Sequence, residues 1–256
     1  MRGARLNAHD HVYLSPHLDD AVLSCGGRIW QQVQAGEHVL VVTICAGIPA
    51  PSALLSPFVQ ELHARWGHPT RAVTGRRGED RAALALLGAG AMHWPYTDCI
   101  YRRAPDGHFP YASEEALFGE IHPADRALVA ELTARLRELS LSHGGTVYAP
   151  LGVGHHVDHR IARQAAEASG QPLIYYEEFP YAQAPQAVWA ALGEGQWEAQ
   201  LAPLSEEALE AKIAAIACYR SQISTFWASL TDMAAAVRAF AGRTDRLAER
   251  YWVLGA

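Results

Sequence analysis

Short apolar runs alternate with amphipathic segments along the first two thirds of the chain. Near-continuous apolar and β-branched runs are typical of parallel strands that are covered on both faces. Such runs predict strands at residues 12–15, 38–44, 92–94, 146–149 and 173–176. Apolar residues at helical spacing predict helices at residues 21–34, 58–62, 76–87 and 125–139, and another through Ile161 and Ala165. This alternation predicts an α/β fold with a mostly parallel, Rossmann-like sheet and helices on both faces.

The last part of the chain, after about residue 180, has a different order of elements. A strand and two helices are predicted there, at residues 196–201, 206–219 and 233–240. No internal repeat and no low-complexity linker separates them from the preceding residues. We therefore expect a single domain over residues 1–256, with the core sheet in about residues 1–180 and a C-terminal α/β elaboration, about residues 181–256, packed on it.

The composition is that of an ordinary globular protein, with 50% hydrophobic and 19% charged residues. The formal net charge is −6, so the chain offers no broad basic field to a phosphate backbone, and we do not expect nucleic acid as a partner. The four cysteines have no CxxC spacing, and we expect them to be small buried residues of a reducing compartment.

The N-terminal residues 1–5 are basic, but they lack the apolar segment that follows in a signal peptide. No apolar run approaches the roughly 20 residues that a spanning helix needs. We therefore expect a cytoplasmic protein without a membrane span. Whether copies of the chain associate into a homo-oligomer stays open.

A first cluster of acid and base groups follows the strand at residues 12–15 directly. It contains His17, Asp19 and Asp20. Three such groups in four residues are costly to desolvate unless a cation joins them, and a divalent metal would do so. Neighbouring side chains in an extended turn point in different directions, so one aspartate could bind the metal while the other faces a water. Taken alone, the cluster is explained equally well as a turn or a helix cap.

A second cluster follows the strand at residues 146–149 and changes this balance. It contains His155, His156, Asp158 and His159. In a parallel sheet both strand ends lie at the same edge, where α/β proteins bind their ligands. His17, Asp20 and His159 could supply the three protein ligands of a catalytic zinc site. Asp19 could then take the proton of a water that attacks a carbonyl carbon.

The remaining residues of the second cluster are expected to assist this chemistry. His156 would face the other side of the carbonyl and stabilise the oxyanion or protonate the leaving amine. Asp158 would hold His156 in the charged form and the right tautomer. His155 is expected to have no metal role, because the ligand set is complete without it. The ion is expected to be Zn²⁺, with another divalent metal such as Fe²⁺ open.

The two motifs Pro16-His17-Leu18-Asp19-Asp20 and His156-Val157-Asp158-His159 resemble those of the PIG-L or LmbE-like zinc-dependent N-acetylglucosaminyl de-N-acetylases. The resemblance extends from about Val12 to Gln222. Its further elements are Arg76 with Glu79, Leu87-Gly88 with Asp98, Tyr175-Tyr176-Glu177, and Lys212 with Tyr219-Arg220-Ser221-Gln222. It implies the same metal ligands and base, an oxyanion or acid role for His156, and sugar contacts from Arg76 and Asp98.

The chain departs from the family pattern at three positions. Leu18 stands where many members have proline, and Ala21 where an acidic residue often follows the aspartate pair. Gly154 stands where some members have a tyrosine, two residues before the histidine of the second motif. The first two changes spare the groups that do chemistry. The third removes a hydroxyl that could have contributed to an oxyanion site.

The leading hypothesis is a zinc-dependent amidohydrolase that hydrolyses the linear C–N bond of an N-acetyl or related N-acyl group on a small amino-sugar conjugate. The alternatives are a metallophosphoesterase, which would need more ligands than are found, and a catalytically silent sugar- or nucleotide-binding relative. A nucleotide site is suggested by Gly26-Gly27, but the turn lacks GxGxxG, and close packing explains these glycines as well. Four aromatic residues could stack on a sugar or simply pack in loops: Trp94, Tyr96, Tyr101 and Tyr181.

Overall fold

A computed structural model describes residues 8–50, 53–66 and 72–255 of the chain. The basic segment at residues 1–5 lies outside the described residues. The strands are β1 (His9–Ser15), β2 (Val39–Thr43), β3 (Gly90–His93), β4 (Leu141–Pro150), β5 (Leu173–Tyr176), β6 (Trp197–Pro203) and β7 (Ala248–Leu254). Within the described residues they form one seven-stranded sheet in the order β3-β2-β1-β4-β5-β7-β6. The first five strands are parallel to one another, and β7 runs antiparallel to both of its neighbours.

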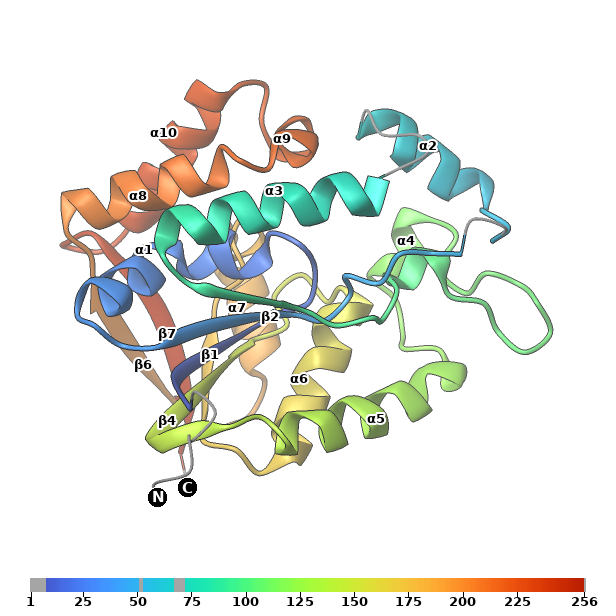
Figure 1. The fold of residues 1–256 in the computed structure, drawn as a ribbon, viewed down its shortest axis with the longest axis horizontal. Coiled ribbons are helices and arrows are strands. Elements are labelled where there is room, and N and C mark those ends of the chain that lie inside the picture. Colours follow the sequence, from blue (N-terminus) through green and yellow to red (C-terminus); the bar gives the residue numbers. More distant parts are fainter. Residues whose placement is uncertain (1–7, 51–52, 67–71, 256) are drawn as a thin grey trace, which may run out of the picture.

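Helices cover both faces of this sheet, as the sequence predicts (Figure 1). One face carries α1 (Asp20–Gln34), α3 (Ala72–Leu87), α8 (Glu206–Ile216) and α10 (Leu230–Ala241); the other carries α5 (Arg126–Arg137), α6 (Val157–Ser169) and α7 (Pro185–Leu192). Successive strand residues alternate between the two cores, since Tyr13 packs with the first group of helices and Val12 and Leu14 with the second. This is why the strands of the core read as continuous apolar runs.

Three further helices lie near the carboxyl ends of the parallel strands: α2 (Pro57–Arg65), α4 (Glu114–Leu117) and α9 (Arg220–Phe226). In Figure 1 the first two extend from the sheet on the side toward which β1 and β2 run. A third apolar cluster, with Val59, Cys99 and Tyr111, holds this region together. These three helices therefore form a rim around the edge of the sheet at which both predicted clusters lie.

The boundaries of some elements differ from the prediction. Helix α3 begins four residues earlier, at Ala72, and β4 begins at Leu141, where it pairs with His9 of β1. Helix α8 ends at Ile216, before Tyr219. Strand β7 was not predicted and lies between β5 and β6. Two adjacent charged residues, Glu249 and Arg250, interrupt its apolar pattern. Their charges are paired with Lys212 and Glu177, which are distant in the sequence, so the local pattern does not indicate a strand.

The glycine pair in α1 allows close packing against the C-terminal region. A Cβ atom at Gly27 would lie 2.8 Å from Leu204 Cδ1, and one at Gly26 would lie 3.1 Å from Lys212 Cγ. The buried Lys212 ammonium donates hydrogen bonds to the Ser24 carbonyl (2.9 Å) and to Glu249 Oε1 (2.8 Å). The structural interpretation of these glycines is therefore confirmed, and the C-terminal region helps to fix the helix that begins at the site.

A helix that crosses a bilayer needs about 20 predominantly apolar residues. None of the helices between residues 8 and 255 that the structure describes combines the necessary length and hydropathy. Three of the cysteines, Cys25, Cys45 and Cys99, are buried as expected, whereas Cys218 is half-buried.

Candidate active site

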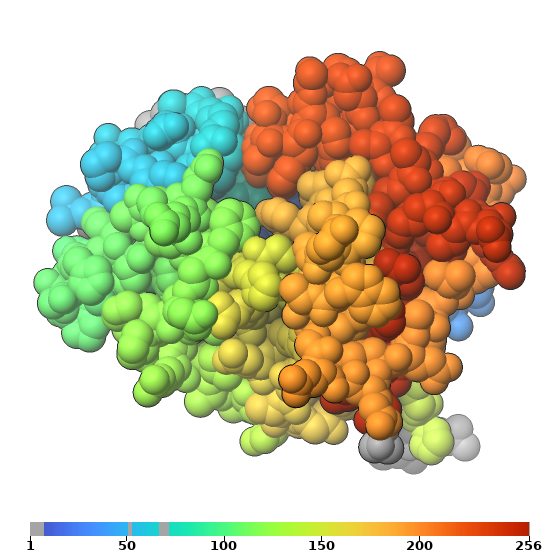
Figure 2. Space-filling view, turned by 180° about the vertical axis from the view of Figure 1, so that it is seen from behind, coloured from blue at the N-terminus to red at the C-terminus, as the bar shows by residue number. Residues whose placement is uncertain are grey.

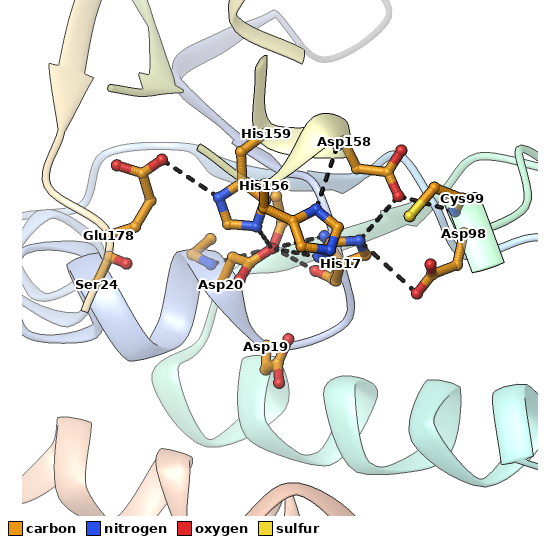
Figure 3. Close-up of polar contacts among 12 residues, drawn as sticks. His17, Asp19, Asp20, Ser24, Asp98, Cys99, His156, Asp158, His159 and Glu178 are labelled. Carbon is orange, nitrogen blue, oxygen red and sulfur yellow. Dashed lines mark hydrogen bonds and ion pairs between the residues drawn. The ribbon is translucent and has the colours of Figure 1, made fainter. Parts of the chain in front are cut away.

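The two predicted clusters meet at the carboxyl edge of the sheet, because β1 and β4 are parallel neighbours. His17, Asp19 and Asp20 stand where β1 passes into α1, and His156 and His159 stand at the start of α6. The imidazole centroids of His17 and His156 are 4.8 Å apart, and those of His17 and His159 are 5.3 Å apart (Figure 3). Residues that are about 140 positions apart in the chain thus form one buried group.

Asp20 is the centre of this group. Its Oδ2 atom lies 3.2 Å from His17 Nδ1 and 3.3 Å from His159 Nε2. Burial would raise the pKa of Asp20, but the two imidazoles hold it well below its usual value. Asp20 in turn affects the histidines. Burial would lower the pKa of His159, but the Asp20 carboxylate helps to raise it to about 9. The pocket between these three side chains therefore favours positive charge.

The outer nitrogen of each histidine is held by a second buried carboxylate. His17 Nε2 lies 3.0 Å from Asp158 Oδ2, and His159 Nδ1 lies 3.2 Å from Glu178 Oε1. A carboxylate accepts a hydrogen bond from the ring nitrogen that it contacts, so in the neutral ring the proton is on that nitrogen and the lone pair of the other nitrogen is directed to the space beside Asp20. Metal-bound histidines in proteins have this arrangement, with the far nitrogen bonded to a carboxylate. The residues present therefore fit a divalent cation between His17, Asp20 and His159.

A second combination of ligands is also compatible with the geometry. His17, His156 and His159 each offer a ring nitrogen, and the three atoms lie within 4.8 Å of one another. His156 Nδ1 accepts a hydrogen bond from the Asp158 backbone amide (3.2 Å) and so caps α6. Because Nδ1 acts as an acceptor there, the proton of the neutral ring is on Nε2. Burial, together with the nearby His17 and His159, lowers the pKa of His156 well below its usual value.

The predicted partnership of Asp158 with His156 takes a different form. The Asp158 carboxylate contacts His17, accepts a hydrogen bond from the Cys99 amide (2.9 Å) and accepts another from the Arg102 guanidinium. Only its backbone N–H reaches His156. Arg102, a half-buried residue that the sequence analysis did not single out, holds the carboxylate on the side of His17. His156 is therefore neutral here, whereas the charged form was expected.

Asp19 points away from this group, toward α3 (Figure 3). Its Oδ1 atom lies 3.4 Å from Arg76 Nη2. Burial raises the pKa of Asp19 to about 7 against the opposing charge of Arg76, and the neighbouring Asp20 adds to the rise. A carboxylate with a pKa near neutrality is suited to accept a proton from water. The two aspartates are thus separated in direction and in acidity, as their different predicted roles require.

A cavity of about 340 Å³ opens from these groups to the surface. Its polar lining includes His17, Asp19, Asp20, Arg76, Asp98 and His156. Its apolar lining includes Phe58, Leu62, Trp66, Leu117, Phe118 and Phe226. Figure 2 shows a hollow on this side of the molecule between the cyan and green segments, which include α2 and α4, and the orange C-terminal segments. The cavity is large enough for a sugar ring with its acyl group.

The two predicted substrate contacts lie in this cavity. The Arg76 guanidinium stacks over the Trp66 ring at 5.0 Å, and its buried Nε atom has no hydrogen-bond partner among the described residues. Asp98 Oδ2 lies 3.7 Å from His17 Nε2. His155, for which no metal role was expected, lines a different surface depression.

Sequence reasoning did not decide the role of Glu178. Besides contacting His159, its carboxylate accepts hydrogen bonds from the amides of Gly152 (2.7 Å) and Val153 (3.1 Å), so it braces the loop that carries the second cluster. The available signal was its position two residues after the end of β5, a third strand that ends at the same edge. Of the aromatic candidates, Trp94 is buried in the core and Tyr181 lines the cavity.

The chain is similar to a known protein family and to two characterised deacetylases. The family model PIG-L, described as GlcNAc-PI de-N-acetylase, matches residues 12–169. A 2'-N-acetylparomamine deacetylase of Niallia circulans is 28% identical over 187 residues, which are 66% of this chain and 66% of that protein. A protein of the same name from Streptomyces fradiae is 28% identical over 197 residues, or 72% of this chain and 62% of its own length. The matched part of the chain thus covers just under two thirds of the length of each of these relatives.

Solved structures show similarity over almost the whole chain. The zinc-inhibited form of teicoplanin deacetylase Orf2 is 30% identical, with a TM-score of 0.83 and coverage of 96% of this chain and 98% of that chain. The A40926 pseudoaglycone deacetylase Dbv21 is 30% identical, with a TM-score of 0.76 and coverage of 97% and 98%. N,N'-diacetylchitobiose deacetylase from Pyrococcus horikoshii, at 20% identity and a TM-score of 0.56, shares the fold; it is covered over 84% of its length and 97% of this chain.

Proposed function

The chain belongs to the PIG-L family, and from this membership we propose that it hydrolyses the N-acetyl amide of an amino-sugar conjugate to acetate and a free amine. The observation that carries the proposal is the pair of histidines around Asp20, each fixed from behind by a buried carboxylate, beside an aspartate whose pKa lies near neutrality. The deacetylase names of the relatives agree with it. This arrangement supplies a cation site and a base in one cavity.

We propose that His17, Asp20 and His159 hold one Zn²⁺ ion, with Fe²⁺ as the principal alternative. Two imidazoles and a carboxylate are an ordinary ligand set for catalytic zinc and leave a position open. Such an ion supplies a Lewis acid for the amide carbonyl and lowers the pKa of water to roughly 7. Because a solved relative is named as a zinc-inhibited form, the assays proposed below use a fixed amount of zinc.

Within this proposal Asp19 is the base. It removes a proton from the water whose oxygen forms the new bond to the carbonyl carbon, and Arg76 keeps its carboxylate oriented. When the C–N bond breaks, that proton is delivered to the departing amine nitrogen. His156 carries its proton on Nε2 and donates a hydrogen bond toward the carbonyl oxygen or the amine. Asp158 acts through His17, which it orients.

Arg76 and Asp98 are proposed to bind the sugar. The unpartnered Nε atom of Arg76 offers a donor to a hydroxyl or carbonyl oxygen of the substrate, and Asp98 offers an acceptor. The apolar lining beyond them would contact the group to which the sugar is attached. We further propose that residues 1–256 act as a single domain, with the segment after about residue 180 packed on the core, in a cytoplasmic protein. The continuation of the sheet through β7 and β6 supports the single domain.

The test is acetate release from a panel of N-acetylglucosaminides by protein that carries one equivalent of Zn²⁺. The change Asp19→Asn removes the base and keeps the side-chain shape, and we expect kcat to fall by roughly 10²–10⁴-fold. The matched control is Asp245→Asn at an exposed position, which should keep full activity. Full activity of Asp19→Asn with zinc bound would contradict the proposed mechanism.

A further inference from the structure

Tyr181 has a hydroxyl group that no residue in the described ranges binds. The chain has ten tyrosines, and the hydroxyl oxygens of the other nine all take part in hydrogen bonds to protein groups. A tyrosine hydroxyl usually finds a partner when its ring is buried, as in seven of these nine, and the two half-buried ones, Tyr96 and Tyr101, also have partners; Tyr181 is half-buried too. The exception lines the cavity of the candidate site, so the free hydroxyl faces the space that a substrate would occupy.

The ring of Tyr181 is held in place by neighbouring aromatic groups. Tyr181 is the first residue of the short 3₁₀ segment Tyr181–Gln183, which follows β5 at the carboxyl edge of the sheet. It packs edge to face against His159 at 6.1 Å, Phe118 at 6.2 Å and Phe226 at 6.4 Å between ring centroids. These three aromatic neighbours limit the movement of the Tyr181 ring. The hydroxyl is therefore a positioned donor at low cost in side-chain entropy.

Gly154 makes this position of the ring available. A Cβ atom built on Gly154 would lie 3.0 Å from Tyr181 Cγ and 3.1 Å from Cδ1, closer than side chains normally approach. The backbone of Gly154 also has φ +84°, which disfavours other residues. The aromatic ring thus occupies the space over the loop, two residues before His156, that a side chain at position 154 would otherwise fill.

The proposed hydrolysis needs one donor for the carbonyl oxygen, on which negative charge develops as water adds, and one for the departing amine; the neutral His156 ring has a single N–H and can serve only one of them. Arg76 is paired with Asp19 and stacks on Trp66, on the part of the cavity assigned to the sugar. Tyr181 lies instead against the proposed metal ligand His159. We propose that the Tyr181 hydroxyl donates a hydrogen bond to the carbonyl oxygen of the scissile amide, which makes it a catalytic residue; this inference rests on the deacetylase function proposed above.

The change Tyr181→Phe tests the inference, because it removes the hydroxyl and keeps the ring. With p-nitrophenyl N-acetyl-β-D-glucosaminide and the zinc-loaded protein, kcat for acetate release should fall by about 100-fold, the usual cost of one oxyanion donor. KM and bound zinc should stay within about twofold of wild type, because the hydrogen bond strengthens only in the transition state. The matched control Tyr175→Phe loses a hydroxyl that bonds Glu167 outside the cavity, and it should behave as wild type. An unchanged kcat, or a rise in KM alone as expected for a sugar contact, would overturn the inference.

Binding of acetate to the zinc-loaded protein gives an independent readout. Acetate presents the oxygen that the hydroxyl is proposed to bind, so Tyr181→Phe should weaken its affinity by about tenfold or more, as followed by NMR of ¹³C-labelled acetate. Equal affinity in wild type and variant, or no binding to either, would refute the role of Tyr181. A wild-type protein that hydrolyses no glucosaminide would refute the proposed function, while the acetate titration would still decide the inference.

Discussion

The buried Asp19 carboxylate should make the metal-free protein less stable at neutral pH than it would be with a neutral side chain. The pKa of this group rises from 3.8 to about 7 on folding, chiefly because burial disfavours its charge. The folded chain therefore binds the proton more tightly than the unfolded chain does. Stability falls as pH rises from about 4 to about 7, and the full penalty is present above that range.

The size of the penalty follows from the two pKa values. The difference between about 7 and 3.8 corresponds to about 4 kcal/mol, at roughly 1.36 kcal/mol for each pH unit. Asp19→Asn replaces the ionised carboxylate with a neutral side chain of similar shape, and the attraction of Arg76 is already included in the difference between the two pKa values. We therefore expect Asp19→Asn to stabilise the metal-free protein at pH 8 by up to about 4 kcal/mol. Each kcal/mol should raise Tm by roughly 2–4 °C in a protein of this size.

The assay is thermal unfolding of chelated wild type and Asp19→Asn between pH 4 and pH 8. The variant should have the higher Tm at pH 8, and the difference should become small near pH 4, which is close to the pKa of 3.8 of Asp19 in the unfolded chain. The exposed Asp245→Asn serves as the control and should show no such pattern. A wild type that is more stable than Asp19→Asn at pH 8, or a difference that does not depend on pH, would refute the reasoning.

Two further predictions concern groups outside the ligand set. Glu178→Gln should weaken zinc affinity by about 10–100-fold, because the carboxylate that orients His159 loses its charge; competition with a chromophoric chelator measures this, and the exposed Glu167→Gln is its control. Lys212→Met should destabilise the protein by about 3–5 kcal/mol in urea unfolding, since it leaves the buried Glu249 without its cation. The double change Lys212→Met, Glu249→Gln should recover part of that loss, and the absence of any recovery would argue against the pair.

The fold was predictable where local pattern and burial agree. The parallel strands β1, β2 and β5 are apolar runs because helices cover both of their faces, and the helices between them show their period clearly. Strand β7 could not be recognised, because Glu249 pairs with Lys212 and Arg250 pairs with Glu177 across the fold. A local sequence pattern cannot indicate a buried strand whose charged residues are neutralised by distant residues.

The site was predictable where it depends on the sheet alone. The proximity of His17, Asp20 and His159 follows from the sequence, because parallel strands end at one edge. The direction of Asp158 does not follow from it, since it depends on Arg102 from a loop without a readable motif. The sequence shows only that position 154 is a glycine and has no side chain. The fold adds that the Tyr181 ring occupies the space in which a side chain at position 154 would lie.

Metal dependence of acetate release tests the central claim most directly. Chelated protein should release no acetate from N-acetylglucosaminides, one equivalent of Zn²⁺ or Fe²⁺ should restore release, and His159→Ala should neither retain the ion nor recover. Acetate release that persists at full rate after chelation, or a His159→Ala variant that binds the ion as tightly as wild type, would contradict it.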